Sequence, residues 1–142
     1  SGVIAGLKLE SSRGEILKAI VEAATFYLRD CFESLPGTGI EIRQCTAAGG
    51  GSQSDIWIQL SADVLNLPFM RPQVHEAGAL GAAILAGVGS GWFPSIRSGV
   101  EAMVHLKQRF EPDPIRQRLY DERYAKYHSF APLMEKYMRE YR

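Results

Sequence analysis

Three consecutive glycines, Gly49 to Gly51, constrain the fold of this chain more than any other feature. The stretch around them, Thr46 to Asp63, predicts the end of a strand, a tight turn, and a helix that opens at Ser52. Glycine has no Cβ atom, so such a turn can adopt positive φ and lets a flat ligand approach its backbone. The helix N-terminus beside it exposes N–H groups and the positive end of the helix dipole. This order of elements is typical of a nucleotide pocket.

Two familiar phosphate-binding patterns do not explain the glycine turn. A dinucleotide fingerprint requires glycine or alanine where Ser54 stands, and an acidic residue about 20 positions later at the end of a strand. The Walker A pattern, with its Gly-Lys pair, is absent. Two interpretations stay open. Either an adenosine-like ligand lies against the turn and Ser54 offers its hydroxyl, or the turn is purely structural.

Strands and helices are predicted to alternate along the chain. The predicted strands are residues 3–9, 40–45 and 69–71. The predicted helices are residues 12–35, 52–66 and 76–87, then a helix capped by Ser95 or Ser98 and a tail helix from 114. The first helix is predicted to begin with a capping box between Ser12 and Glu15 and to end at Leu35-Pro36-Gly37. The tail helix is predicted to have a break or kink near Pro132 and an inward stripe of Ile115, Leu119, Tyr120, Tyr124, Tyr127 and Phe130. This alternation indicates an α/β fold with parallel strands and helical crossovers. The strand at 69–71 lies between two prolines and is expected at a sheet edge.

The helix predicted at Glu76 to Gly87 is unusually rich in small residues. Its interior Gly78 and Gly81 each cost about 1 kcal/mol relative to alanine. One interpretation is a plain helix buried on the sheet. The other is a hinge helix that a second backbone crosses closely, because only small side chains permit that approach.

Charge and composition argue against several kinds of partner. The 16 basic and 16 acidic residues cancel, so no nucleic acid and no anionic membrane is expected as a partner. The sequence contains no apolar run of roughly 18 residues that would indicate a membrane span, and we expect a cytoplasmic protein. Cys31 and Cys45 lack the spacing of a metal or redox motif and are predicted to be reduced core thiols.

Isolated polar residues offer little sign of catalysis. His75-Glu76 lacks the HExxH spacing, so no metal site is predicted. Ser52 and Ser54 have no paired histidine in the pattern. Asp55, in the first turn of its helix, is expected to complement the helix dipole rather than to act as a base.

Longer motifs carry a resemblance. The stretch GGGSQSDIWIQLSADVLNLP, followed by RPQVHEAGALGAAILAGVGSGWF, resembles the C-terminal domain of the FGGY family of carbohydrate kinases. Glu22 fits the helix that the family usually shows as Arg-Ala-x-x-Glu-Gly, with Lys18 in place of the arginine and Ala23 in place of the glycine. The FEPDP segment and the tyrosine-rich tail are also similar, so the resemblance covers essentially the whole chain.

The resemblance implies a ribonuclease-H-like domain of the actin- and hexokinase-type ATPase fold. By the same resemblance, Gly49, Gly50, Gly51 and Ser54 form the adenosine motif. The interdomain hinge then comprises Glu76, Gly78, Gly81 and Ala82. Residues 1–111 are expected to form the core of the domain and residues 112–142 a helical tail packed on it. The first strands and the N-terminal domain are expected to lie outside this chain.

The resemblance also implies a reaction, namely transfer of a phosphoryl group from ATP to a sugar hydroxyl, with a pentulose such as xylulose or ribulose as the assumed substrate. Catalytic residues, both phosphate loops and any Mg²⁺ ligands are expected outside this chain, and the sugar would bind through the N-terminal domain. The chain alone is therefore expected to be inactive and to bind adenine nucleotides weakly at best. The alternative is a non-catalytic module that dimerises through an exposed sheet edge.

Overall fold

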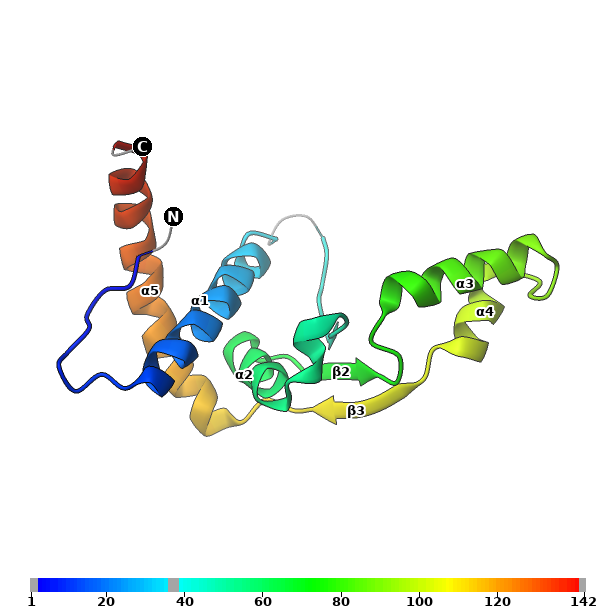
Figure 1. Cartoon of the computed structure of the whole chain (residues 1–142), viewed down its shortest axis with the longest axis horizontal. Helices are drawn as coiled ribbons and strands as arrows, with labels where there is room; N and C mark the ends of the chain where they lie inside the picture. Colours follow the sequence, from blue (N-terminus) through cyan, green and yellow to red (C-terminus); the bar gives the residue numbers. More distant parts are fainter. Residues whose placement is uncertain (1–2, 36–38, 141–142) are drawn as a thin grey trace. The chain divides into compact units, whose positions relative to one another are not determined.

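The computed structural model describes residues 3–35 and 39–140 (Figure 1). These residues fall into two compact units. The first comprises the described parts of 1–41 and 113–142, and the second comprises 42–112. The predicted division after residue 111, with the tail packed on the preceding domain, stays a prediction.

Helix α1 (Arg13–Glu33) opens the first unit with the predicted capping box. The Ser12 hydroxyl accepts from the Glu15 N–H at 3.2 Å, and the Glu15 carboxylate accepts from the Ser12 N–H at 2.7 Å. The hydrogen bonds from the Ser12 backbone and hydroxyl lower the pKa of Glu15. The helix ends at the C-cap Ser34, and the Pro36-Gly37 part of the predicted stop lies outside the described residues.

Helix α5 (Pro114–Glu140) packs on α1 through aromatic rings and ion pairs. The buried ring of Phe26 contacts three tyrosines of α5, which are Tyr120, Tyr124 and Tyr127. Two ion pairs at 2.7 Å join the helices, Arg29 to Asp121 and Arg123 to Glu22. The Tyr124 hydroxyl donates to Asp30 at 2.6 Å and to Glu33 at 2.9 Å. Burial, followed by these two carboxylates, raises the pKa of Tyr124.

Two predictions for the tail helix are wrong in part. Pro132 lies inside α5, which continues for two further turns, so a break is absent and the alternative, a kink, stays a prediction. A proline removes one backbone donor, and the helix tolerates that loss here. The buried stripe is also narrower than the sequence pattern indicated, because Ile115 and Leu119 are exposed while Tyr120 and Tyr124 are buried.

The second unit contains a sheet of three described strands in the order β1 (Cys45–Thr46), β2 (Phe69–Pro72), β3 (Leu106–Phe110). Strands β1 and β2 are parallel, as predicted, whereas β2 and β3 are antiparallel. The edge position predicted for residues 69–71 is wrong, because β2 is central and buried. Pro72 is tolerated there because the β2–β3 register shifts between Arg71 and Pro72.

The other strand predictions were too long or wrong. The strand predicted at 40–45 shrinks to the two residues of β1, and residues 3–8 form no regular secondary structure. A strand requires a neighbour to satisfy its backbone, and within the described ranges residues 3–8 pair with no strand. Strand β3 was not predicted.

Helix α2 (Asp55–Leu65) covers the sheet and supplies the core of this unit. Ile58 and Ala62 pack with Phe69 of β2 and Phe110 of β3, and all four side chains are buried. Cys45 packs against this cluster, and burial raises the pKa of its thiol. Cys31, the other predicted core thiol, is exposed on α1.

Helices α3 (Ala77–Gly89) and α4 (Ile96–Met103) pack against each other between β2 and β3 in the sequence (Figure 1). The α3 helix is the predicted small-residue helix, extended by two residues at its C-terminal end. Ser95, one of the two predicted caps, forms a capping box with Ser98 at the start of α4. Ile84 is the buried residue of α3 and faces α4.

Candidate functional site

The glycine turn joins β1 to α2 and has a conformation that requires glycine. Gly49 has φ 79° and ψ −172°, a region that residues with a Cβ essentially never occupy. Its N–H donates to the His75 carbonyl at 2.8 Å, and its own carbonyl accepts from the Ser52 N–H at 3.1 Å. The His75 carbonyl also accepts from the Ala77 N–H at 3.0 Å. One carbonyl therefore ties the turn to the first residue of α3.

A short 3-10 helix, Gly50–Gln53, follows Gly49, and α2 begins only at Asp55. The predicted helix start at Ser52 is therefore three residues too early. Ser54 is the N-cap, because its hydroxyl accepts from the Trp57 N–H at 3.3 Å while its N–H donates to the Gly51 carbonyl at 3.2 Å. Ser52 is buried, and its hydroxyl donates to the Gly49 carbonyl at 2.7 Å. Ser54 is thus the serine with a hydroxyl hydrogen left to donate.

A shallow hollow of about 140 Å³ lies beside the turn, with Ala47, Gly51, Ser52 and Trp57 in its wall. A Cβ atom on Gly51 would lie 3.5 Å from the Trp57 ring, whereas one on Gly50 would project into open space. Small-molecule sites usually measure about 300–1,000 Å³, so this hollow has room for only part of a nucleotide. Gly49, Gly50, Gly51 and Ser54 are brought together in one turn, and their adenosine role stays a prediction.

Asp55 has a partner that the sequence pattern did not indicate. Its carboxylate lies 2.5 Å from Nη2 of Arg71, a buried arginine of β2. The Arg71 Nη1 donates to the Gln108 side chain of β3 at 3.1 Å. The dipole position predicted for Asp55 is confirmed, since it lies in the first turn of α2. The sequence shows only a single arginine between Pro68 and Pro72, and this pattern does not indicate an ion pair with Asp55.

The predicted hinge residues lie together in the first half of α3. Glu76 is the N-cap and makes no side-chain capping bond, and Ala82 is exposed. A Cβ atom on Gly78 or Gly81 would meet nothing within 4 Å among the residues described. That face of α3 is therefore open among the described residues, and the hinge role of Glu76, Gly78, Gly81 and Ala82 stays a prediction.

Two other glycines, Gly87 and Gly99, make the close contacts of this helix pair, and the sequence pattern did not single them out. A Cβ atom on Gly87 would lie 2.6 Å from the Phe93 ring. A Cβ atom on Gly99 of α4 would lie 2.7 Å from Cγ2 of Ile84 and 3.2 Å from the Phe93 ring. Helices α3 and α4 can therefore approach as they do because these two positions lack side chains.

Replacing Gly99 by alanine should lower the free energy of unfolding by about 1–3 kcal/mol, because β-branched Ile84 has little freedom to move away. Replacing Gly78 by alanine is the matched control. Its Cβ has open space, so helix propensity should raise stability by up to about 1 kcal/mol. Urea unfolding of both variants measures the difference, and equal midpoints would show that α3 and α4 do not pack as described.

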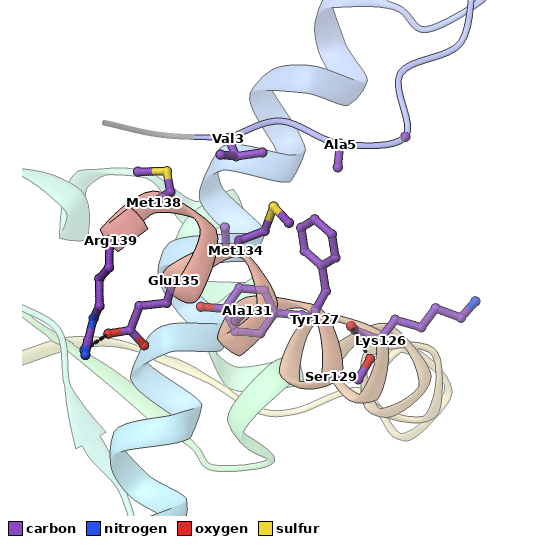
Figure 2. A pocket seen from close by; sticks show the side chains of 13 residues that line it. Val3, Ala5, Lys126, Tyr127, Ser129, Ala131, Met134, Glu135, Met138 and Arg139 are labelled. Carbon is purple, nitrogen blue, oxygen red and sulfur yellow. Dashed lines mark hydrogen bonds and ion pairs between the residues drawn. The ribbon is translucent and has the colours of Figure 1, made fainter. Parts of the chain in front are cut away.

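The first unit holds a larger pocket, of about 1050 Å³, between the N-terminal segment and the second half of α5. Figure 2 shows Met134 and Met138 on the side of α5 toward Val3. Glu135 and Arg139 form an ion pair at its rim. The wall is mainly apolar and contains none of the predicted site residues. Its size is therefore not a reason to place the chemistry there.

Residues 3–35 and 39–140 contain no group of three or more His, Cys, Asp or Glu side chains that could hold a metal ion. Nε2 of His75 and Oε1 of Glu76 lie 3.3 Å apart. None of the helices in these ranges is sufficiently long and apolar to cross a bilayer.

Comparison with known proteins assigns this arrangement to a family. Residues 1–90 match the family model of the FGGY family of carbohydrate kinases, C-terminal domain. A xylulose kinase of Staphylococcus epidermidis is 35% identical over 126 residues, which cover 89% of this chain and 25% of the relative. A glycerol kinase of Caldanaerobacter subterraneus subsp. tengcongensis is 37% identical over 123 residues, covering 84% of this chain and 24% of the relative. The chain thus spans about a quarter of the length of these curated relatives.

Solved structures agree with the sequence matches. The crystal structure of xylulose kinase from Rhodospirillum rubrum superposes with a TM-score of 0.75 at 30% sequence identity, covering 95% of this chain and 28% of that one. The predicted fold class is confirmed, because the similar solved structures are FGGY sugar kinases with the actin- and hexokinase-like ATPase fold. The chain belongs to the FGGY family of carbohydrate kinases and corresponds to their C-terminal domain.

Proposed function

We propose that this chain is the adenosine-binding part of a kinase that transfers a phosphoryl group from ATP to a sugar hydroxyl. One observation carries the proposal, namely the backbone of Gly49 to Gly51 at the N-terminal end of α2, in which Gly49 has a conformation that only glycine adopts readily. A flat base could rest on this surface because no Cβ atom intervenes. The Ser54 hydroxyl caps α2 through its oxygen, so its hydrogen is free to reach the base or the ribose.

The remaining steps of phosphoryl transfer require groups that we assign to other parts of the protein. A kinase needs a positioned nucleophile and neutralisation of the phosphate charge, usually with Mg²⁺. Asp55, the carboxylate next to the glycine turn, is committed to Arg71. We therefore place no catalytic residue and no Mg²⁺ ligand in the described part of this chain, and we propose that the chain alone is inactive.

The sugar would bind through an N-terminal domain, with the first half of α3 as the hinge between the domains. The open face at Gly78 and Gly81 supports this role, because a second backbone could approach it closely. A pentulose is the proposed substrate, supported by the similarity to xylulose kinases. A protein that consumes ATP in this way would act in the cytoplasm.

The alternative, a non-catalytic dimerisation module, has less support. Strand β3 has a free edge within the described sheet, as such a module requires. However, Lys107 and Arg109 lie along this strand and are exposed. In the antiparallel register that places Lys107 of one β3 strand opposite Arg109 of another, these like charges would face each other, which disfavours self-association.

The proposal is tested with the full-length protein in a coupled assay that follows ADP release. We expect ATP consumption with xylulose or ribulose, and less with glycerol and gluconate. Faster turnover with glycerol would show that the substrate is a polyol rather than a pentulose, and it would leave the proposed nucleotide site unchanged. No sugar-dependent ATP consumption and no ADP binding by calorimetry would overturn the proposed function.

A further inference from the structure

Arg71 is a buried cation in the centre of the second unit. Its side chain belongs to the central strand β2, and the whole residue is only 9% exposed. It lies on the same sheet face as Phe69, and its guanidinium carbon lies 5.1 Å from the centre of the Phe110 ring. Its Nε atom is buried and has no hydrogen-bond partner among the residues described. A charge so placed is costly unless a partner compensates it.

The compensating partner is Asp55, and this pair leads directly to the glycine turn. The 2.5 Å contact between Arg71 and Asp55 joins the centre of the sheet to the first residue of α2. The preceding residue, Ser54, caps the same helix and donates its N–H to the Gly51 carbonyl. The ion pair, the cap and the turn thus form one continuous series of contacts.

We infer that Arg71 is a positioning residue for the nucleotide, acting through Asp55. The charge-assisted bond holds the first turn of α2 at a fixed place relative to β2, and the Gly49–Gly51 turn is fixed with it. The Asp55 side chain is 65% exposed, and an ion pair with an exposed partner contributes little stability, so stability alone does not explain the buried arginine here. The inference rests on the proposed function, because it assigns Arg71 a role in that nucleotide site.

The test uses the full-length protein, with ADP binding measured by calorimetry and stability measured by thermal unfolding. D55N removes the charge of the partner, and R71M removes the buried cation. Each should weaken ADP binding about tenfold, because a displaced turn would lose about the equivalent of one hydrogen bond to the nucleotide. The affinity for the sugar should stay within about twofold, because the nucleotide side alone is displaced. D55E retains the carboxylate and should restore most of the ADP affinity.

The double variant D55N/R71M separates positioning from stability. With both partners gone, no uncompensated charge remains buried, so the unfolding temperature should recover toward that of the unmodified protein. ADP binding should stay about tenfold weaker, no worse than in either single variant, because the two residues act as one unit. ADP affinity that recovers along with the unfolding temperature would show that the pair only stabilises the fold. If the loss of ADP affinity in the double variant equals the product of the two single losses, Asp55 acts without Arg71.

E101Q is the matched control, because it removes the carboxylate of another ion pair, Arg97 to Glu101, on the surface of α4. It should change neither ADP affinity nor stability. If the unmodified protein binds ADP and D55N binds it equally well, the role of Arg71 is overturned while the proposed function stands. If the unmodified protein does not bind ADP, the proposed function itself is overturned.

Discussion

Replacing Gly49 by alanine should lower the free energy of unfolding by about 1–3 kcal/mol and weaken ADP binding at least about tenfold. With φ 79° and ψ −172°, this residue has a backbone that alanine adopts only under strain. Relief of the strain would rotate the N–H away from the His75 carbonyl, and the turn would separate from the start of α3. Urea unfolding and calorimetry with ADP measure the two effects on the full-length protein.

Gly50 provides the control, because it has no positive φ and a Cβ atom there would meet nothing within 4 Å. G50A should therefore leave stability unchanged. If a base lies against the turn, the added methyl group will still weaken ADP binding, so the control separates a ligand surface from a structural turn. Full ADP affinity in G50A together with a loss of stability in G49A would favour the purely structural interpretation.

Replacing Gly81 by leucine should lower sugar-dependent turnover about a hundredfold while the protein stays folded. A Cβ atom at this position would meet nothing within 4 Å among the described residues, and leucine is the better helix former, so no loss of stability is expected. If a second backbone crosses α3 there during domain closure, the leucine will hold the domains apart. A displacement of about 1 Å can cost a hundredfold in rate. Steady-state kinetics should show that kcat and KM change together, as is common for hinge variants.

The same substitution at Gly89 is the comparison for this prediction. Gly89 lies at the C-terminal end of the same helix and also has open space around it, but lies outside the predicted hinge residues. G89L should keep nearly full turnover. A loss of activity in G89L equal to that in G81L would show that the effect comes from α3 as a whole. Unchanged activity in G81L would remove the hinge assignment.

The features that the sequence predicted well are those with a local cause. The capping box at Ser12 and Glu15 depends on residues three apart, so its pattern was visible in the sequence and is present in the structure. The helical spacing in α1 and α2 and the family motif around Gly49 predicted the fold class for the same reason. The start of α2 was misplaced because Ser52 and Ser54 are both good caps, and the 3-10 helix Gly50–Gln53, which contains Ser52, leaves no pattern in the sequence.

The features that the sequence did not predict depend on residues far apart in the chain. Strand β3 exists because Phe110 pairs with Phe69 across the sheet, and nothing in LKQRF specifies that partner. The Arg71–Asp55 ion pair likewise joins two residues that lie 16 positions apart. The His75 carbonyl that binds Gly49 is a backbone group, which has no sequence signature. The glycine turn could therefore be located from the sequence, whereas the contacts that hold it could not.

The pairing of α1 with α5 bears on how much the length of the chain between these two helices can vary. The contacts between these helices join residues 91 to 101 positions apart, as in Tyr124–Glu33 and Arg123–Glu22. The whole second unit, residues 42–112, is therefore the loop that this helix pair closes. The entropy of closing a loop grows only logarithmically with its length, by about 0.6 kcal/mol per doubling. Insertions in the loops of the second unit would thus cost the helix pair very little, so this unit can change length while its closing helices stay the same.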